Sequence, residues 1–98
     1  MSTIFAGQSA LRIRLTCGQD ISGALEQKIR FRKPDGTVGE WSAAIEDADN
    51  GILYHDISSE IDISEPGVWT FWAYVKFSDG RIGYGEAVKQ RVYPEGEG

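Results

Sequence analysis

Residues 69–77 read Trp69-Thr70-Phe71-Trp72-Ala73-Tyr74-Val75-Lys76-Phe77, and this stretch decides the fold class. Apolar residues occupy every odd position, which is the two-residue period of a β-strand with one face in a core. The even positions carry a second aromatic row, Trp72 and Tyr74, on the opposite face. A chain of 98 residues forms one domain with one core, so the second row requires a separate explanation.

The segments on either side repeat the alternation, and turn-forming residues separate them at the spacing of short strands. Strands are predicted over residues 11–16, 25–32, 38–46, 52–57, 68–77 and 82–93. The turn signals are Pro34-Asp35-Gly36, Asn50-Gly51 and Ser78-Asp79-Gly80. Residues 58–63 are expected to form a single helical turn, because serine caps a helix and acids favour its N-terminus. We therefore predict an all-β, immunoglobulin-like antiparallel β-sandwich of about seven strands over residues 1–93, with a small barrel as the alternative and a polar tail at 94–98.

The segment that precedes this decisive strand resembles the tyrosine corner of such sandwiches. Residues 62–69 (DISEPGVW) place an aromatic directly after an acidic corner that contains glycine. Trp69 stands where a tyrosine is usual, so we expect the hydrogen bond of the tyrosine hydroxyl to be lost.

The net charge of −5 and the pI of about 4.7 argue against nucleic acid as a partner. The charge is unevenly distributed, with +4 over residues 1–33 and −9 over residues 34–98. This distribution predicts a polarised molecule. The sequence shows neither an apolar run long enough for a membrane span nor the pattern of a secretory signal, so we expect no membrane partner.

The inventory of reactive residues argues against an enzyme. His55 is the single histidine and Cys17 the single cysteine, and neither lies in a catalytic or zinc-binding motif. We expect no catalytic residue, no metal and no cofactor. Cys17 is predicted to be a small buried or half-buried apolar residue and His55 to occupy an outward strand position. Residues 47–51 (DADNG) lack the later ligands of a calcium loop and are interpreted as a solvated turn.

Two surfaces are candidates for binding. Five cations occupy even positions of the first two predicted strands, so pairing of these strands would gather them into one basic patch; the alternative is a solvated sheet face that discourages edge pairing. The second surface is the outward aromatic row, extended by Tyr84 if that residue lies across the hairpin. The alternative explanation is that these aromatics lie under long Lys and Arg stems. The candidate interaction residues are Arg12, Arg14, Lys28, Arg30, Arg32, Trp72, Tyr74 and Tyr84.

A series of short motifs resembles a known family. In chain order they are residues 18–24 (GQDISGA), 29–37 (IRFRKPDGT), 40–41 (EW), 66–69 (PGVW), 77–81 (FSDGR) and 92–94 (VYP). Together they resemble small immunoglobulin-like proteins of tailed bacteriophages and are similar to the N-terminal domain of phage baseplate upper proteins.

This resemblance implies a non-enzymatic virion structural protein, assembled in the host cytoplasm, that acts as a tail, baseplate or fibre-anchoring subunit. Its implied partners are other virion proteins and copies of itself. One alternative is a capsid decoration or head-fibre protein. An alternative from another class is a carbohydrate-binding module that recognises host surface glycans through Trp41, Trp72 or Tyr84.

Overall fold

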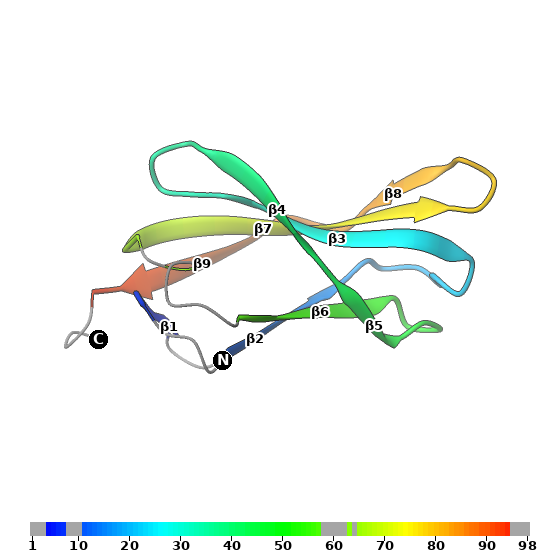
Figure 1. Cartoon of the computed structure of the whole chain (residues 1–98), viewed down its shortest axis with the longest axis horizontal. Helices are drawn as coiled ribbons and strands as arrows, with labels where there is room; N and C mark the ends of the chain where they lie inside the picture. Colours follow the sequence, from blue (N-terminus) through cyan, green and yellow to red (C-terminus); the bar gives the residue numbers. More distant parts are fainter. Residues whose placement is uncertain (1–3, 8–10, 58–62, 64, 95–98) are drawn as a thin grey trace.

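The computed structural model describes residues 4–7, 11–57, 63 and 65–94, which form a sandwich of two β-sheets (Figure 1). The larger sheet has the strand order β1-β9-β7-β3-β4, with β8 also paired to β7, and the smaller sheet has the order β2-β6-β5. The strands are β1 (Ile4–Phe5), β2 (Leu11–Thr16), β3 (Ala24–Arg32), β4 (Val38–Ser42), β5 (Ala44–Asp47), β6 (Ile52–Ile57), β7 (Gly67–Phe77), β8 (Ile82–Tyr84) and β9 (Val88–Tyr93). The predicted all-β, immunoglobulin-like sandwich is confirmed.

Strand β7 lies at the centre of the larger sheet, between β3 on one side and β8 and β9 on the other. Its odd residues form the inner row: Trp69, Phe71, Ala73 and Val75 are each at most 2% exposed. Leu53 of the smaller sheet is fully buried in the same core. The alternation that predicted this strand therefore also identified the residues that join the two sheets.

Trp69 departs from expectation at the corner before β7. Its indole Nε1–H donates a hydrogen bond to the backbone carbonyl oxygen of Glu65 at 2.8 Å. The predicted loss of the corner hydrogen bond is wrong, because the indole N–H replaces the tyrosine hydroxyl as donor.

Two predicted strands are each divided in the structure. Residues 38–46 form β4 in the larger sheet and β5 in the smaller sheet, and the chain changes sheets at Ala43, whose N–H donates to the Gln27 carbonyl oxygen at 3.2 Å. Residues 82–93 form β8 and β9, separated where Gly85 approaches the backbone of Thr16; a Cβ on Gly85 would lie 2.9 Å from the Thr16 oxygen. Local alternation does not reveal such changes of partner.

Strand β2 pairs with β6, from Leu11↔Ile57 to Thr16↔Ile52, and β3 pairs with β4 and β7. The expectation that the first two long strands lie side by side is therefore wrong. The chain passes from one sheet to the other between β2 and β3, as it does in immunoglobulin-like sandwiches.

The turn before β6 is as predicted. Gly51 has a positive φ of 70°, and a Cβ there would lie 2.2 Å from the Gln19 carbonyl oxygen, so the position requires glycine. The predicted helical turn at 58–63 lies outside the described residues except for Ile63, which is fully buried. In the part of the chain that the structure describes, no helix has the length and apolar character needed to cross a bilayer.

Candidate functional site

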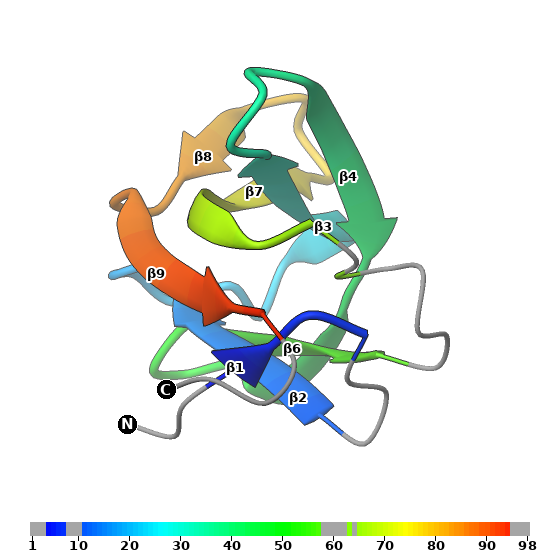
Figure 2. The same ribbon diagram turned by 90° about the vertical axis from the view of Figure 1, so that its left-hand side faces the viewer.

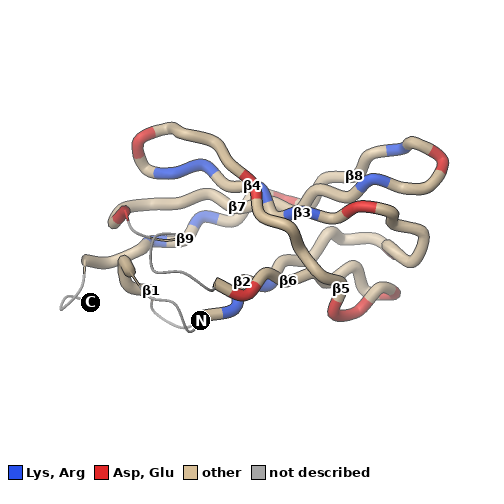
Figure 3. The backbone as a smooth tube through the Cα atoms, in the orientation of Figure 1, with Lys and Arg blue, Asp and Glu red and all other residues tan. Residues whose placement is uncertain are grey.

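The outer face of the larger sheet carries most of the sheet's cations, and we call it the basic face. Its residues alternate with the buried rows of β3, β7 and β9, and Figure 3 shows Lys and Arg along these strands. Six cations face outward, against the two acids Glu26 and Glu40, which gives this face a positive charge although the chain is acidic. The cations are Lys28, Arg30, Arg32, Lys76, Lys89 and Arg91.

Aromatic side chains lie at the centre of the basic face. The guanidinium carbon of Arg30 lies 4.2 Å from the centroid of the Tyr74 ring and 6.0 Å from that of Tyr84. The two tyrosines pair across β7 and β8, with ring centroids 5.8 Å apart, so Tyr84 extends the outward aromatic row. Trp72, half-buried, pairs with Arg30 across β7 and β3. Arg30 covers Tyr74, which is 8% exposed, whereas Tyr84 is 58% exposed.

The two acids of the basic face lie beside two of its cations. Lys28 Nζ lies 2.5 Å from Glu40 Oε2 and 3.0 Å from Glu26 Oε1, while Arg30 Nε lies 3.4 Å from Glu40 Oε1. The hydrogen bond to Glu40, with the one to Glu26, raises the pKa of Lys28, and the bond from Lys28 lowers the pKa of Glu40. These ion pairs link the outward side chains of β3 to Glu40 of β4.

Four cations of the basic face remain available to a partner. Within the described ranges, none of them lies within ion-pair distance of a carboxylate: Arg32, Lys76, Lys89 and Arg91. Arg32 is exposed on β3, and Lys89 and Arg91 are exposed on β9. This unpaired charge attracts an acidic surface and repels a basic one.

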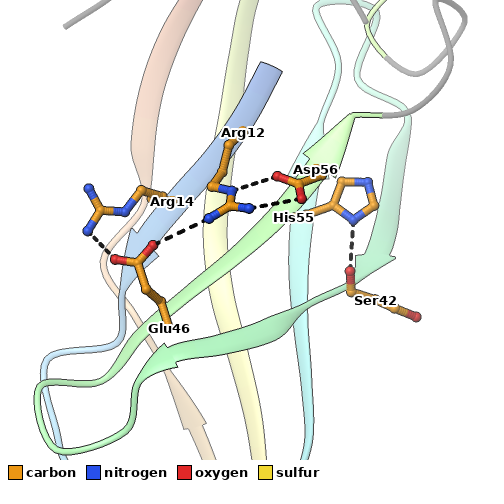
Figure 4. Close-up of polar contacts among 6 residues, drawn as sticks. All are labelled: Arg12, Arg14, Ser42, Glu46, His55 and Asp56. Carbon is orange, nitrogen blue, oxygen red and sulfur yellow. Dashed lines mark hydrogen bonds and ion pairs between the residues drawn. The ribbon is translucent and has the colours of Figure 1, made fainter. Parts of the chain in front are cut away.

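Arg12 and Arg14 do not join this face. They lie on the outer face of the smaller sheet (Figure 4), where Arg12 donates to both carboxylate oxygens of Asp56, at 2.6 and 3.1 Å. Glu46 accepts a hydrogen bond from Arg14 and lies 3.9 Å from Arg12. The predicted single patch is therefore wrong, because the five cations occupy the outer faces of two opposed sheets.

The same ion pairs correct the predicted polarity of the molecule. Arg12, Arg14 and Lys28 each pair with an acid from the negative part of the sequence, at position 56, 46 or 40. Folding thus places acids from the negative part of the sequence beside bases from the positive part. After these pairs form, the excess positive charge lies on the basic face of the larger sheet and not at one end of the molecule.

Cys17 is buried and His55 is half-buried. His55 Nδ1 lies 2.8 Å from the Ser42 carbonyl oxygen, its ring stacks on Trp41 at 4.9 Å, and its Nε2 is buried without a partner among the described residues (Figure 4). The predicted outward position of His55 is wrong, because His55 lies on the same face of β6 as the buried Leu53 and pairs with the buried Ile13 of β2. Cys17 is buried, as predicted, and burial raises the pKa of its thiol.

Sequence reasoning missed half of the basic face. Lys76, Lys89 and Arg91 are absent from the predicted interaction residues. The signal was present, because Lys76 alternates with core residues of β7, and Lys89 and Arg91 alternate with the inward positions 88, 90 and 92 of β9. If the charges had been counted over the outward-facing positions of each predicted strand, and not over the first and last parts of the chain, these three cations would have been included.

No family model and no curated protein matches the chain. Among solved structures, the chain is similar to CopC from Methylosinus trichosporium OB3b, with a TM-score of 0.61 and 18% identity over 99% of this chain and 89% of CopC. At this identity the similarity establishes the β-sandwich fold alone. The resemblance to phage baseplate proteins stays a prediction.

The predicted virion function and virion location are corrected, because the solved structure to which the chain is similar is CopC and no family model or curated protein connects the chain with a virion. The tail, baseplate, fibre and capsid roles are withdrawn with them. The glycan-binding alternative is also withdrawn: of its three residues, Trp41 packs against the core, 4.5 Å from Phe31, and Trp72 is half-buried, which leaves Tyr84 as the one exposed ring of the three. These positions leave no row of exposed aromatic faces for a sugar.

Proposed function

We propose that the chain is a non-enzymatic binding domain whose basic face binds an acidic surface of another protein. The observation that carries the proposal is the Arg30–Tyr74–Tyr84 cluster, on a face that also carries four cations without carboxylate partners among the described residues. Arg and Tyr are enriched in the centres of protein interfaces, where they supply contact area and directed hydrogen bonds. Exposed apolar side chains at Val68 and Ile82 lie on the same face and add area to be buried.

An acidic protein suits this face better than a nucleic acid does. Single-stranded nucleic acids stack their bases on open aromatic faces. Here Arg30 occupies the face of Tyr74, and Trp72 is half-buried, which leaves Tyr84 as the exposed ring of the cluster.

Copper binding, the property of CopC, does not fit the donor set of this chain. The described residues contain no group of three or more His, Cys, Asp or Glu arranged to hold a metal ion. His55 faces the Ser42 carbonyl oxygen with Nδ1, and Cys17 is buried. The similarity to CopC therefore extends to the sandwich and not to a site.

The experiment uses poly-L-glutamate as the probe of an acidic partner and oligothymidine as the probe of a single-stranded nucleic acid. Titration calorimetry should show binding to poly-L-glutamate that weakens with added salt, and an Arg32→Ala/Arg91→Ala variant should weaken it about tenfold or more. Arg81→Ala removes one charge from the hairpin tip, where Arg81 pairs with Asp79, and serves as the control. Tighter binding to oligothymidine, or equal binding by all variants, would contradict the proposal.

A further inference from the structure

Three cations lie together at one end of the basic face, around Thr70 of β7. Thr70 pairs with Arg32 of β3 on one side and with Lys89 of β9 on the other. Arg91 pairs with Val68, which stands two residues before Thr70 in the same outward row. Figure 2 faces this end of the sandwich, with β9 at the left, β4 at the right, and β7 and β3 between them. We call Thr70 and the three cations the cationic end.

No acid neutralises the cationic end in the part of the chain that the structure describes. Its three cations are exposed, and none forms an ion pair with a described carboxylate. Asp35 and Glu86 lie in the connections that follow β3 and precede β9, and neither pairs with these cations. Asp35 instead accepts a hydrogen bond from the Thr37 N–H at 2.8 Å. The cationic end therefore offers the full charge of its three cations to a partner.

The opposite end of the basic face lies around Tyr74, and we call it the tyrosine end. It carries three cations and two acids, and the acids already lie beside two of the cations, which leaves a charge of +1. These cations are Lys28, Arg30 and Lys76. The outward residues of the neighbouring β8, Ile82 and Tyr84, are 50% and 58% exposed. This end therefore offers apolar surface and little net charge.

The sheet fixes the separation of the two ends, because β7 carries both. Thr70 and Tyr74 are four positions apart on β7, a distance of about 13 Å at about 3.3 Å per residue. Across the sheet, Arg32 and Lys89 lie two strand spacings apart, about 10 Å. Their long side chains can reach one acidic cluster above Thr70. A partner that matched both ends would carry its acidic and its apolar side chains about 13 Å apart.

We propose that the basic face binds a segment of an acidic protein in one orientation, with a cluster of Asp or Glu side chains on the cationic end and an apolar side chain on the tyrosine end. This inference rests on the proposed function and adds to it where each part of the partner lies. Complementary charges fix the register of a complex and make its formation sensitive to salt. Apolar contact at Ile82 and Tyr84 adds affinity that salt does not screen.

The test uses the full chain and two synthetic peptides, each with a cluster of glutamates at one end. In the leucine peptide, leucines follow after a spacer of about 13 Å, and in the serine peptide serines replace them. Titration calorimetry should show the leucine peptide bound about tenfold more tightly. A nitroxide spin label on its glutamate end should broaden the NMR amide signals of Thr70 and Lys89. A label on its leucine end should broaden those of Ile82 and Tyr84 instead.

Two lysines provide a matched pair of variants. Lys89→Ala and Lys76→Ala each remove one exposed cation without a carboxylate partner among the described residues, the first from the cationic end and the second from the tyrosine end. Lys89→Ala should weaken binding of the serine peptide about threefold or more beyond the effect of Lys76→Ala, and should lower its salt dependence further. Tyr84→Ala should remove most of the advantage of the leucine peptide over the serine peptide. The spin-label measurement uses the unaltered chain and decides the orientation even if a variant fails to fold.

The outcomes distinguish this inference from the proposed function. If poly-L-glutamate binds but the two lysine variants weaken peptide binding equally, or either label broadens both pairs of amides, the basic face is a binding surface without a single orientation. If neither poly-L-glutamate nor either peptide binds, both proposals are wrong. Amide signals of Thr70 and Lys89 that shift with chain concentration in the absence of peptide would identify a second copy as the occupant. Signals that change when the chain is ended at Pro94 would identify its own C-terminal acids, and either result overturns the inference.

Discussion

The ring of Phe31 on β3 covers Gly39, its cross-strand partner on β4. A Cβ built on Gly39 would lie 2.5 Å from Cζ of Phe31, closer than side-chain contacts allow. Phe31 in turn lies between Trp41 and Trp69, with ring centroids 4.5 and 5.5 Å away. The ring therefore occupies the space that any larger residue at position 39 would need.

Gly39→Ala should lower the free energy of unfolding by about 1–3 kcal/mol, because the added methyl group forces the Phe31 ring out of a packed aromatic cluster. Urea denaturation monitored by tryptophan fluorescence measures the change. Gly23→Ala is the matched control, since its Cβ would lie 4.0 Å from Phe77 and should shift the stability by no more than about 0.5 kcal/mol. Equal effects of the two substitutions would show that the ring moves aside freely.

Trp69→Phe should also destabilise the fold, by about 2–4 kcal/mol, because it removes buried volume and leaves the Glu65 carbonyl oxygen without its indole donor. Trp72→Phe, at a half-buried position on the outer face, should cost about 1 kcal/mol or less. Both free energies come from urea denaturation. A Trp69→Phe variant as stable as the unaltered chain would mean that the corner hydrogen bond and the indole volume contribute nothing.

The strands were predictable where the signal is local. The alternation in residues 69–77 predicted both the central strand and its buried row, and glycine in the 33–36 and 50–51 segments marked turns at the right places. Which strand lies beside which depends on contacts distant in the sequence. For that reason the partner of β2 and the change of sheet at Ala43 were not foreseen.

The candidate site was predictable to the same extent. The sequence allowed Tyr84 to join Tyr74 on the condition that it lies across the hairpin, and the short β7–β8 hairpin fixes that register. Arg12 and Arg14 were grouped with the wrong cations, since the grouping assumed a strand pairing that the fold does not make. The loss of a corner hydrogen bond was mispredicted at Trp69 because the donor was identified by residue type and not by the position of its N–H.

Cys17 should react slowly with a thiol reagent while the chain is folded. The residue is 7% exposed, and burial raises the pKa of its thiol, so less of the reactive thiolate is present at a given pH. We expect the reaction with Ellman's reagent at pH ~8 to be about tenfold or more slower than in denaturant, with the unfolded chain as internal reference. Similar rates in both conditions would indicate that the core around Cys17 opens readily.

The Arg12–Asp56 pair should make stability depend on pH in the acidic range. The hydrogen bond from Arg12 lowers the pKa of Asp56 below its ordinary value of 3.8, so the folded state favours the carboxylate. A carboxyl whose pKa is lower in the folded state stabilises the fold at pH values above its unfolded pKa. That contribution is lost as the pH falls through the folded pKa.

Asp56→Asn should therefore reduce the unfolding free energy at neutral pH, and the difference from the unaltered chain should shrink from about pH 5 downward. Urea denaturation across this range measures it. In an Arg12→Gln background the same substitution should have little effect at any pH, because the partner charge is gone. Added salt should also reduce the effect, since both side chains are largely exposed. A difference that stays constant from neutral pH to pH ~2 would show that the substitution acts through packing and that the ion pair contributes nothing.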